Sequence, residues 1–531
     1  MSSRSLVTIL LLWLGITALD YNKAFHIDDT FHLKAAQWLE QHPGAPLGGQ
    51  VNWIADPEPM HHFNQPPGFF YLVALTARFT GFHEGPLHLM RSLFTLLALL
   101  CMYRLALHRA PRHALLLTAL FALCPAYMVN QGLMTDVPLL AMLLLFAVFL
   151  LVPGRLPAGW RHVLAGLALS AALLIKYSAL PMWVVFILWM VLRREWRYIA
   201  TALIPVAALA IWSAINLHEY GGVHLLDRNG GHSALADIVE RNLAFVVALG
   251  AVAPFSPAFL GAFFRNPGRW IAPAWAVGLA VAAVAVLLTA SGHLAEAPVN
   301  QVLRNLFFIN GLLMLGYAVR FLPRSIGTAT AETWTLAAWA FGMALFLVLF
   351  SPQMATRYLL PTLVPVLLLI APALDRINRT AKALALASTG LLGVLLTISD
   401  KVYADFFRQQ APIVAREMHA ATPGTVWSVG HWGWQWYAEQ AGMAVYGTTT
   451  SPVAVGDIVV IPQDIDVQPL APGLVLEPIA KWDEPPGPAT FFNVEQFANM
   501  YTSSYGTGAM PWRLTRTHHK TIIAYRVART G

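Results

Sequence analysis

The stretch that decides the fold is LVTILLLWLGITAL, residues 6–19, followed shortly afterwards by HIDDTFH, residues 26–32. The first run is predominantly apolar, whereas the second carries two adjacent carboxylates, Asp28 and Asp29. A membrane-spanning helix needs roughly 20 residues to cross a hydrocarbon core about 30 Å thick. We therefore expect an acid pair just after the end of a first membrane helix, a position that favours chemistry at the bilayer surface.

The whole chain has the composition of a membrane protein. Of its 531 residues, 57% are hydrophobic and only 11% are charged, and the mean hydropathy is +0.57. These values exclude an ordinary soluble globular domain. About thirteen spans are predicted, near residues 5–20, 87–107, 114–130, 137–152, 163–175, 178–192, 199–215, 243–264, 270–290, 303–320, 332–350, 358–373 and 383–399.

Basic residues cluster in every second loop between these spans. The clusters are Arg109 and Arg112; Arg155 and Arg161; Arg193, Arg194 and Arg197; Arg265 and Arg269; Arg320 and Arg324; and Arg376, Arg379 and Lys382. By the positive-inside rule, these loops and the N-terminus are cytoplasmic, and the acid pair lies outside. The net charge of +7 thus reflects orientation and contact with lipid head groups, and we expect no nucleic-acid partner.

The chain divides into two predicted domains. Residues 1–399 form the transmembrane module, which includes a long polar outer loop at 21–86. Residues 400–531 read as a small extracytoplasmic α/β domain, because short β-like runs follow a helical stretch near 403–419. These runs are Thr425–Gly430, Met443–Gly447, Asp457–Pro462 and Thr521–Val527.

Lys176 is predicted to lie at lipid depth. About thirty residues separate the basic clusters at Arg161 and Arg193, and because both clusters belong inside, the chain must cross and return within them. Each arm is then only about 20 Å long, shorter than the hydrocarbon core. A charge held there costs about 2.5–3.5 kcal/mol, so we expect an acidic partner close by.

Several charged residues end up at the outer ends of the predicted helices: Asp28 and Asp29, Asp136, Lys176 and Arg357. Two adjacent carboxylates cannot both ionise freely, so one is expected to hold a raised pKa and to act as a base. Cations beside lipid suit the phosphate of a polyprenyl carrier. The set is typical of a site that transfers a group from a lipid-linked phosphate to a hydroxyl.

These residues also carry a resemblance to a known family. The run from Asp28 to Ala36 resembles the Asp-Glu-x-x-Tyr-x-x-x-Ala signature that opens the first outer loop of GT-C glycosyltransferases of the protein-mannosyltransferase and aminoarabinose-transferase type (glycosyltransferase family 39-like). The run from Asn64 to Leu72 is similar to the family's x-x-Pro-Pro-x-x-x-Tyr/Trp-Leu pattern. Stretches around Asp136, Lys176 and Arg357 match in the same order.

The resemblance implies a GT-C fold and a membrane glycosyltransferase of a bacterial inner membrane. It would move a sugar from a polyprenyl-phosphate donor to a lipid, glycan or protein acceptor, with inversion. Asp28 occupies the family's catalytic-base position, while Asp29 replaces the family's Glu and His32 its Tyr. Lys176 and Arg357 are expected to bind the donor phosphate, with Asp136 and His32 as accessory residues.

Other interpretations stay open. Asp28 and Asp29 could be favourable charges at a helix start, Lys176 could snorkel to the surface, and Asp136 could cap a helix. A polytopic transporter or lipid-linked sugar flippase is the alternative function, although its charges should lie near the bilayer midplane. A purely structural assembly subunit gives no reason for the acid pair.

Two further patterns are assigned ordinary roles. The cluster Asp56, Glu58, His61 and His62 has metal-ligand chemistry, but its spacing fits no standard site. We expect no metal or other cofactor, with a divalent ion as the alternative. The aromatic run 431–437 could stack on sugar rings, but an interfacial belt or a domain core is the favoured interpretation.

Overall fold

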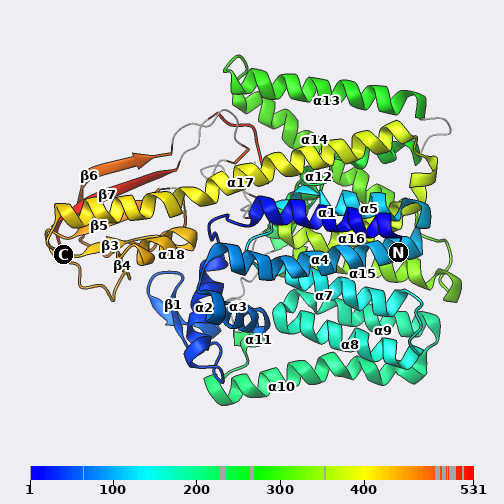
Figure 1. Ribbon diagram of the computed structural model, residues 1–531, viewed down its shortest axis with the longest axis horizontal. Helices are drawn as coiled ribbons and strands as arrows, with labels where there is room; N and C mark the ends of the chain where they lie inside the picture. Colours follow the sequence, from blue (N-terminus) through cyan, green and yellow to red (C-terminus); the bar gives the residue numbers. More distant parts are fainter. Residues whose placement is uncertain are drawn as a thin grey trace.

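The computed structural model describes residues 2–530 apart from Asn64, 228–234, 263–267, 352–353, Asp464, 485–490, 493–497, Asn499, 502–509 and 517–519. The predicted features at Asn64 and Arg265 therefore lie outside the described residues. Figure 1 shows a large helical bundle with a smaller sheet-containing part at one end. The predicted mainly α membrane fold with a small C-terminal sheet domain is confirmed.

Helices account for most of the described chain. They are α1 (Ser3–Asp20), α2 (Asp29–Gln41), α3 (Gly68–Thr80), α4 (Glu84–Arg109), α5 (Ala114–Ala122), α6 (Pro125–Val129), α7 (Asp136–Leu151), α8 (Ala158–Ile175), α9 (Pro181–Arg193), α10 (Leu203–Tyr220), α11 (His224–Asp227), α12 (Leu235–Ala251), α13 (Gly268–Ala290), α14 (Glu296–Arg320), α15 (Ala331–Phe350), α16 (Leu360–Ile370), α17 (Arg379–Ala421) and α18 (Trp432–Gln440). Short 3₁₀ helices include η3 (Tyr177–Ala179) and η7 (Thr356–Leu359).

Nine helical segments in the described chain are long and apolar enough to cross a membrane, and three shorter apolar helices accompany them. The span predicted at 114–130 is instead two short helices, α5 and α6. Pro125 begins the second of them. A proline disfavours helical backbone at the residue before it, here Cys124, and so ends the first helix. The predicted turn at Lys176 is present, since α8 ends at Ile175 and α9 begins at Pro181.

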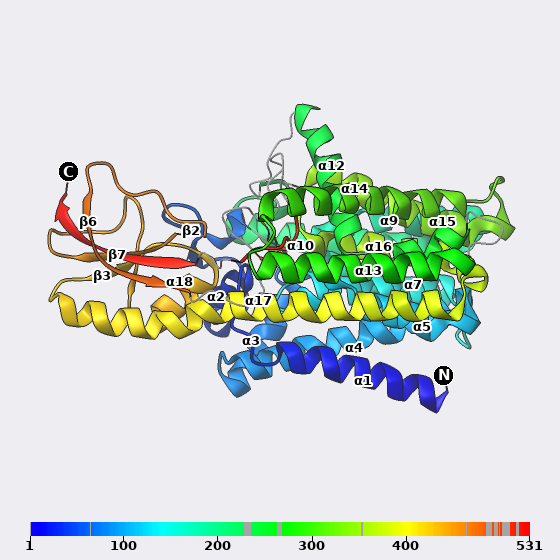
Figure 2. The ribbon, with the colours of Figure 1, turned by 90° about the horizontal axis from the view of Figure 1, so that it is seen from above.

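The helix α17 crosses the predicted domain boundary at residues 399 and 400. It runs unbroken for 43 residues, about 65 Å at 1.5 Å per residue. Figures 1 and 2 both show it passing along the bundle and on alongside the sheet domain. The predicted last span and the predicted helix near 403–419 are thus one continuous element, because no Gly or Asn cap separates them.

The sheet domain comprises β3 (Val426–Ser428), β4 (Ala444–Val445), β5 (Ile458–Pro462), β6 (Val475–Asp483), β7 (Thr521–Arg529) and the helix α18. The strand order is β4-β3-β5-β7-β6, with β3 parallel to β4 and β5, and β7 antiparallel to β5 and β6. Four of these strands match the predicted runs, whereas β6 was not predicted. Its burial pattern is mostly exposed or half-buried, so it lacks the apolar signal of a core strand.

The outer loop 21–86 packs onto the sheet domain. Its hairpin, β1 (Gln50–Asn52) and β2 (Pro57–Pro59), reaches the domain through the Asn52 side chain, which donates to the Tyr446 carbonyl at 2.7 Å. The backbone N–H of Thr448 also donates to the Ala55 carbonyl at 2.9 Å. Buried backbone and amide groups need such partners, so these two regions, distant in sequence, cover the same end of the bundle.

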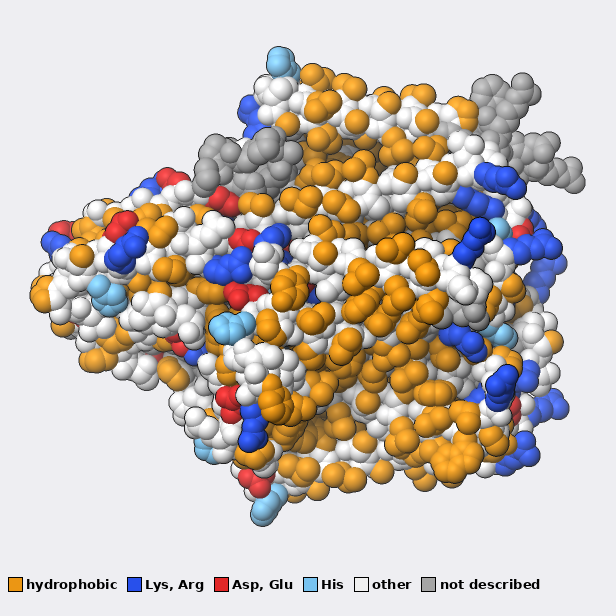
Figure 3. Space-filling model, in the orientation of Figure 1, with side chains coloured by type: hydrophobic (Ala, Val, Ile, Leu, Met, Phe, Trp, Pro, Cys, Tyr) orange, Lys and Arg blue, Asp and Glu red, His pale blue; other side chains and the backbone are white. Residues whose placement is uncertain are grey.

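Charge is distributed unevenly along the long axis. Figure 3 shows Lys and Arg gathered at the end of the bundle away from the sheet domain, with hydrophobic side chains covering the face between the two ends. The N-terminus lies at that basic end (Figure 1). The bundle therefore has one basic end and one end covered by the outer loop and the sheet domain, and the site described next lies near the second.

Candidate active site

Four charged side chains from distant segments meet in one chain of contacts. Lys176 Nζ lies 2.7 Å from Asp136 Oδ1, and the other Asp136 oxygen lies 3.2 Å from Arg357 Nε. Arg357 Nη2 in turn donates to Asp28 Oδ2 at 2.9 Å. The structure thus brings together Asp28, Asp136, Lys176 and Arg357, and Asp136 is the acidic partner that the depth of Lys176 was expected to require.

Local backbone breaks place each of these side chains. Asp136 is the first residue of α7, and Asp28 immediately precedes α2. Lys176 has extended backbone between α8 and η3, and Arg357 lies in η7, directly before α16. Polar side chains at helix ends can face one another without interrupting an apolar span, because the helix interior stays free of charge.

Exposure separates the four side chains. Asp28 is 30% exposed, whereas Arg357 is only 1% exposed and Lys176 and Asp136 are 9% and 5% exposed. A catalytic base must come within hydrogen-bonding reach of the proton that it abstracts. Asp28 is therefore the member of this chain that an incoming hydroxyl can contact, while the two cations lie behind it.

The Tyr358 ring contacts both cations. The Lys176 ammonium is 4.6 Å from the centre of its ring, and the Arg357 guanidinium is 4.9 Å from it. A cation over an aromatic face is stabilised by the ring quadrupole. The side chain thus holds both positive charges in one place without neutralising either.

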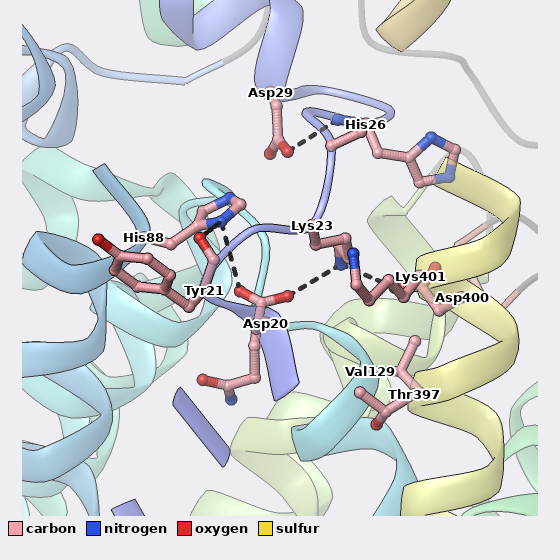
Figure 4. Close-up of polar contacts among 12 residues, drawn as sticks. Asp20, Tyr21, Lys23, His26, Asp29, His88, Val129, Thr397, Asp400 and Lys401 are labelled. Atoms are coloured by element: carbon pink, nitrogen blue, oxygen red, sulfur yellow. Dashed lines mark hydrogen bonds and ion pairs between the residues drawn. The ribbon is translucent and has the colours of Figure 1, made fainter. Parts of the chain in front are cut away.

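A tight turn presents Asp28. Ile27 has φ of +51°, a left-handed backbone that β-branched residues rarely adopt. Asp29 closes the turn twice, since its N–H donates to the His26 carbonyl at 3.1 Å and its Oδ2 accepts from the His26 N–H at 2.9 Å. Figure 4 shows this carboxylate facing His26. Strained backbone of this kind costs about 1–3 kcal/mol and tends to occur at functional sites.

The two carboxylates have different environments. Asp29 is fully buried, and burial raises its pKa to about 7, against the opposing effect of Lys23. The expected repulsion by Asp28 is the smallest of the causes. The acid pair therefore includes a group with a raised pKa, as expected, but the main cause is desolvation. This group is Asp29, whereas the carboxylate that faces solvent is Asp28.

His32 is buried in an aromatic environment. Its ring lies 5.1 Å from that of Phe70 and 6.3 Å from that of Phe69. Its Nδ1 donates to the Leu133 carbonyl at 2.9 Å, since a carbonyl can only accept. Burial lowers its pKa, so the ring is neutral at pH 7. This position suits packing of the site wall, and the charges of Asp28, Lys176 and Asp136 act on the ring electrostatically.

A tail segment that the sequence reasoning missed also reaches Arg357. Arg357 Nη1 donates to the main-chain carbonyl of Tyr501 at 3.3 Å. The Met500 carbonyl accepts from the Thr356 N–H at 3.1 Å and from its hydroxyl at 2.8 Å. Main-chain carbonyls carry no sequence signature, and the partners are 144 residues apart, so no local pattern points to this contact.

The side chains of the other polar cluster of the outer loop contact neighbouring parts of the protein. Asp56 accepts hydrogen bonds from Thr449 and Thr450 of the sheet domain, and the His61 ring stacks on Tyr220 at 5.0 Å. Among the residues that the structure describes, no group of three or more His, Cys, Asp or Glu side chains is arranged to hold a metal ion.

The aromatic run 431–437 belongs to the packing between regions. Trp434 and Trp436 of α18 are buried, and the Trp436 ring meets that of Phe25 edge to face at 5.9 Å. Gly433 lies so close to the Phe25 carbonyl that a Cβ would sit 2.4 Å from it. These aromatic residues therefore form a core between the start of the outer loop and the sheet domain.

Comparison with solved structures gives similar chains of low identity. ArnT from Cupriavidus metallidurans bound to undecaprenyl phosphate is 15% identical and covers 86% of this chain and 92% of its own, with a TM-score of 0.41. The archaeal oligosaccharyltransferase AglB from Archaeoglobus fulgidus, in complex with an inhibitory peptide and a dolichol-phosphate, is 13% identical. The match covers 83% of this chain and 64% of AglB, with a TM-score of 0.44. The arabinofuranosyltransferase AftD from Mycobacteria is 14% identical. The match covers 100% of this chain and 40% of AftD, with a TM-score of 0.42.

Comparison with curated protein sequences gives no significant match. A family model gives one: residues 64–217 match the model described as dolichyl-phosphate-mannose-protein mannosyltransferase. This segment contains Asp136 and Lys176, two members of the charged chain. The match confirms the resemblance seen in the sequence over residues 64–217, and in this segment the chain is similar to that mannosyltransferase family.

Proposed function

We propose that this protein transfers a sugar from a polyprenyl-phosphate donor to an acceptor hydroxyl, with Asp28 as the base. The observation that carries the proposal is the partly exposed Asp28 carboxylate, held by Arg357 at the open end of a buried chain of charges. The family model that matches residues 64–217 is named for a sugar carried on a dolichyl phosphate, which supports a lipid-phosphate donor.

The proposed step is a single displacement. Asp28 takes the proton of the acceptor hydroxyl as the hydroxyl oxygen forms a bond to the anomeric carbon. The bond from that carbon to the phosphate oxygen breaks, and its electron pair leaves with the polyprenyl phosphate. Attack and departure occur on opposite faces, so the anomeric centre is inverted.

Lys176 and Arg357 would stabilise the negative charge that develops on the departing phosphate. Both cations are paired with carboxylates in this structure. Because an ammonium carries three N–H donors and a guanidinium five, either cation can bind a phosphate oxygen while it keeps its carboxylate partner. Fixed charges in a water-poor site stabilise such a transition state more strongly than the same charges in water.

We also propose that the site faces the outside of a bacterial inner membrane. The basic loops gather at the opposite end of the bundle (Figure 3), and the positive-inside rule assigns that end to the cytoplasm. A reporter that is active only outside the cytoplasm should be active when fused after residue 400 and silent when fused after Arg324. The reverse pattern would contradict this orientation.

Mass spectrometry of envelope glycans and glycolipids tests the activity. Cells that carry the parent protein should contain a glycan or glycolipid that is missing in cells without it and in cells that carry Asp28→Asn. The added mass would identify the sugar class, and the modified species would identify the acceptor. Identical spectra from all three strains would contradict sugar transfer.

A further inference from the structure

Tyr501 joins the candidate active site to a second, fully buried group of charges. Its main-chain carbonyl accepts from Arg357 Nη1 at 3.3 Å, and its hydroxyl donates to Asp400 Oδ2 at 2.9 Å. Lys23 Nζ lies 3.4 Å from the same hydroxyl. One residue of the C-terminal part of the chain thus touches both charge groups.

The second group is a closed set of charges between α1, α4 and α17. Lys23 Nζ lies 2.7 Å from Asp400 and 3.3 Å from Asp20, and Arg91 Nη2 lies 2.8 Å from Asp20. All four side chains are at most 2% exposed. Figure 4 shows Lys23 between Asp20 and Asp400. We call Asp20, Lys23, Arg91 and Asp400 the sealed network.

Such a network is suited to holding backbone segments in place. Buried ions that keep their partners are rigid, because losing a partner leaves an uncompensated charge away from water. The Tyr501 hydroxyl is anchored to this set, and burial raises the pKa of that hydroxyl well above its usual range. The hydroxyl therefore keeps its proton and serves as a neutral donor to Asp400.

We propose that Met500 and Tyr501 form a seat that positions Arg357, and that the sealed network anchors this seat through the Tyr501 hydroxyl. Met500 holds Thr356, the residue before Arg357, by two hydrogen bonds. Tyr501 holds the guanidinium itself, since its carbonyl accepts from Nη1 while Asp28 accepts from Nη2. Tyr501 is thus a positioning residue, and the C-terminal part of the chain completes the active site.

The inference rests on the proposed function, because it assigns Tyr501 to the phosphate-binding arginine of that reaction. Small displacements of a catalytic group lower rates strongly, since the reacting atoms must be aligned within fractions of an ångström. Tyr501→Phe keeps the ring and the main-chain carbonyl but loses the anchor to Asp400. We expect kcat/KM for the donor to fall about tenfold, the order of one hydrogen bond to a charged group, while the KM for the acceptor stays unchanged.

The test is a double-mutant cycle with Arg357→Lys, measured with a panel of undecaprenyl-phosphate-linked sugars as donors. If Tyr501 acts through Arg357, adding Tyr501→Phe to Arg357→Lys should lower kcat/KM by less than about twofold, because non-additivity marks residues that act together. Tyr103→Phe is the matched control, since its buried hydroxyl donates to Ser5 near the other end of the bundle. It should leave kcat/KM unchanged.

The seat would be overturned, with sugar transfer left intact, if the loss of kcat/KM in the double variant equalled the product of the losses in Tyr501→Phe and Arg357→Lys. A Tyr501→Phe variant as active as the parent would overturn it as well. Thr356→Val removes the hydroxyl that donates to the Met500 carbonyl and accepts from Asn130. It gives a second probe and should lower the same parameter. A parent protein inactive toward every donor would overturn the proposed function instead. The same cycle measured on unfolding temperatures would then decide whether Tyr501 and Arg357 are coupled, and additive temperature shifts would contradict the seat.

Discussion

Two chains of charges among the described residues differ in their exposure to solvent. The sealed network of Asp20, Lys23, Arg91 and Asp400 is at most 2% exposed throughout. The active-site chain from Lys176 to Asp28 is equally well paired but ends in a carboxylate that is 30% exposed. A closed set of paired ions has no site for a substrate, whereas an open one can exchange a partner. Pairing alone therefore does not mark a candidate site, and solvent access to one member is the feature that separates the two networks.

Breaking the sealed network should have the largest effect on the free energy of unfolding. Lys23→Met removes the cation between Asp20 and Asp400, and stranding a buried charge typically costs about 3–5 kcal/mol. We expect the free energy of unfolding to fall by that order, with loss of folded protein from the membrane. Urea or thermal unfolding in detergent measures it.

Lys401→Met is the control for this variant. Lys401 lies next to Asp400 on α17 and is 29% exposed, with Asp405 as its partner. An exposed pair contributes about 1 kcal/mol or less, so this variant should fold like the parent. Equal losses in the two variants would show that burial does not distinguish the networks.

Breaking the open chain at Lys176 should change donor use, and Asp136 keeps Arg357 as an ion-pair partner. Lys176→Ala is expected to raise the donor KM by at least about tenfold, since a charge-assisted contact to phosphate is lost. Acceptor dependence should be nearly unchanged, and Lys176→Arg should retain part of the activity because the charge survives. Titration of the polyprenyl-phosphate sugar against both variants measures this.

The snorkelling interpretation predicts the opposite for the same residue. Removing an expensive charge from lipid depth would be tolerated or even stabilising. An unchanged donor KM in Lys176→Ala would therefore leave Arg357 as the only proposed phosphate ligand.

A smaller effect separates the roles of the two adjacent carboxylates. Asp29→Asn keeps an oxygen that can accept from the His26 N–H, whereas Asp29→Ala removes the acceptor that holds the Ile27 turn. We expect Asn to stay within about threefold of the parent and Ala to lose about tenfold in kcat, the order of one hydrogen bond. Initial rates of the two purified variants decide this. Equal, large losses would make Asp29 a proton acceptor in its own right.

A further expected effect is a dependence of stability on pH. Burial raises the pKa of Asp29 to about 7, so between pH of about 4 and 7 the folded state holds a proton that the unfolded chain has released. The contribution of Asp29 to stability is therefore greatest at low pH and falls as the pH rises through that window. The unfolding temperature of Asp29→Asn, relative to the parent, should rise from pH 4 to 7 and then level off. A constant difference would contradict the raised pKa.

The sequence predicts the parts of this picture that depend on local signals. Apolar runs mark the spans, and charged residues at their ends mark Asp28, Asp136, Lys176 and Arg357 as a set. It does not reveal which carboxylate faces water, because burial of Asp29 depends on packing around the outer loop. Nor does it reveal the contacts of Met500 and Tyr501, which use main-chain carbonyls. The continuity of α17 was missed for a related reason, since polarity changes along it while the helix does not end.

The central claim is that Asp28 is the base in transfer from a lipid-linked phosphate. The most direct measurement is the release of undecaprenyl phosphate from undecaprenyl-phosphate-linked sugars by the purified parent and by Asp28→Asn. The account predicts a fall of about 10²- to 10⁴-fold, the usual contribution of a general base, at an unchanged unfolding temperature. Release within about threefold of the parent, far below the loss expected for a missing base, would contradict it.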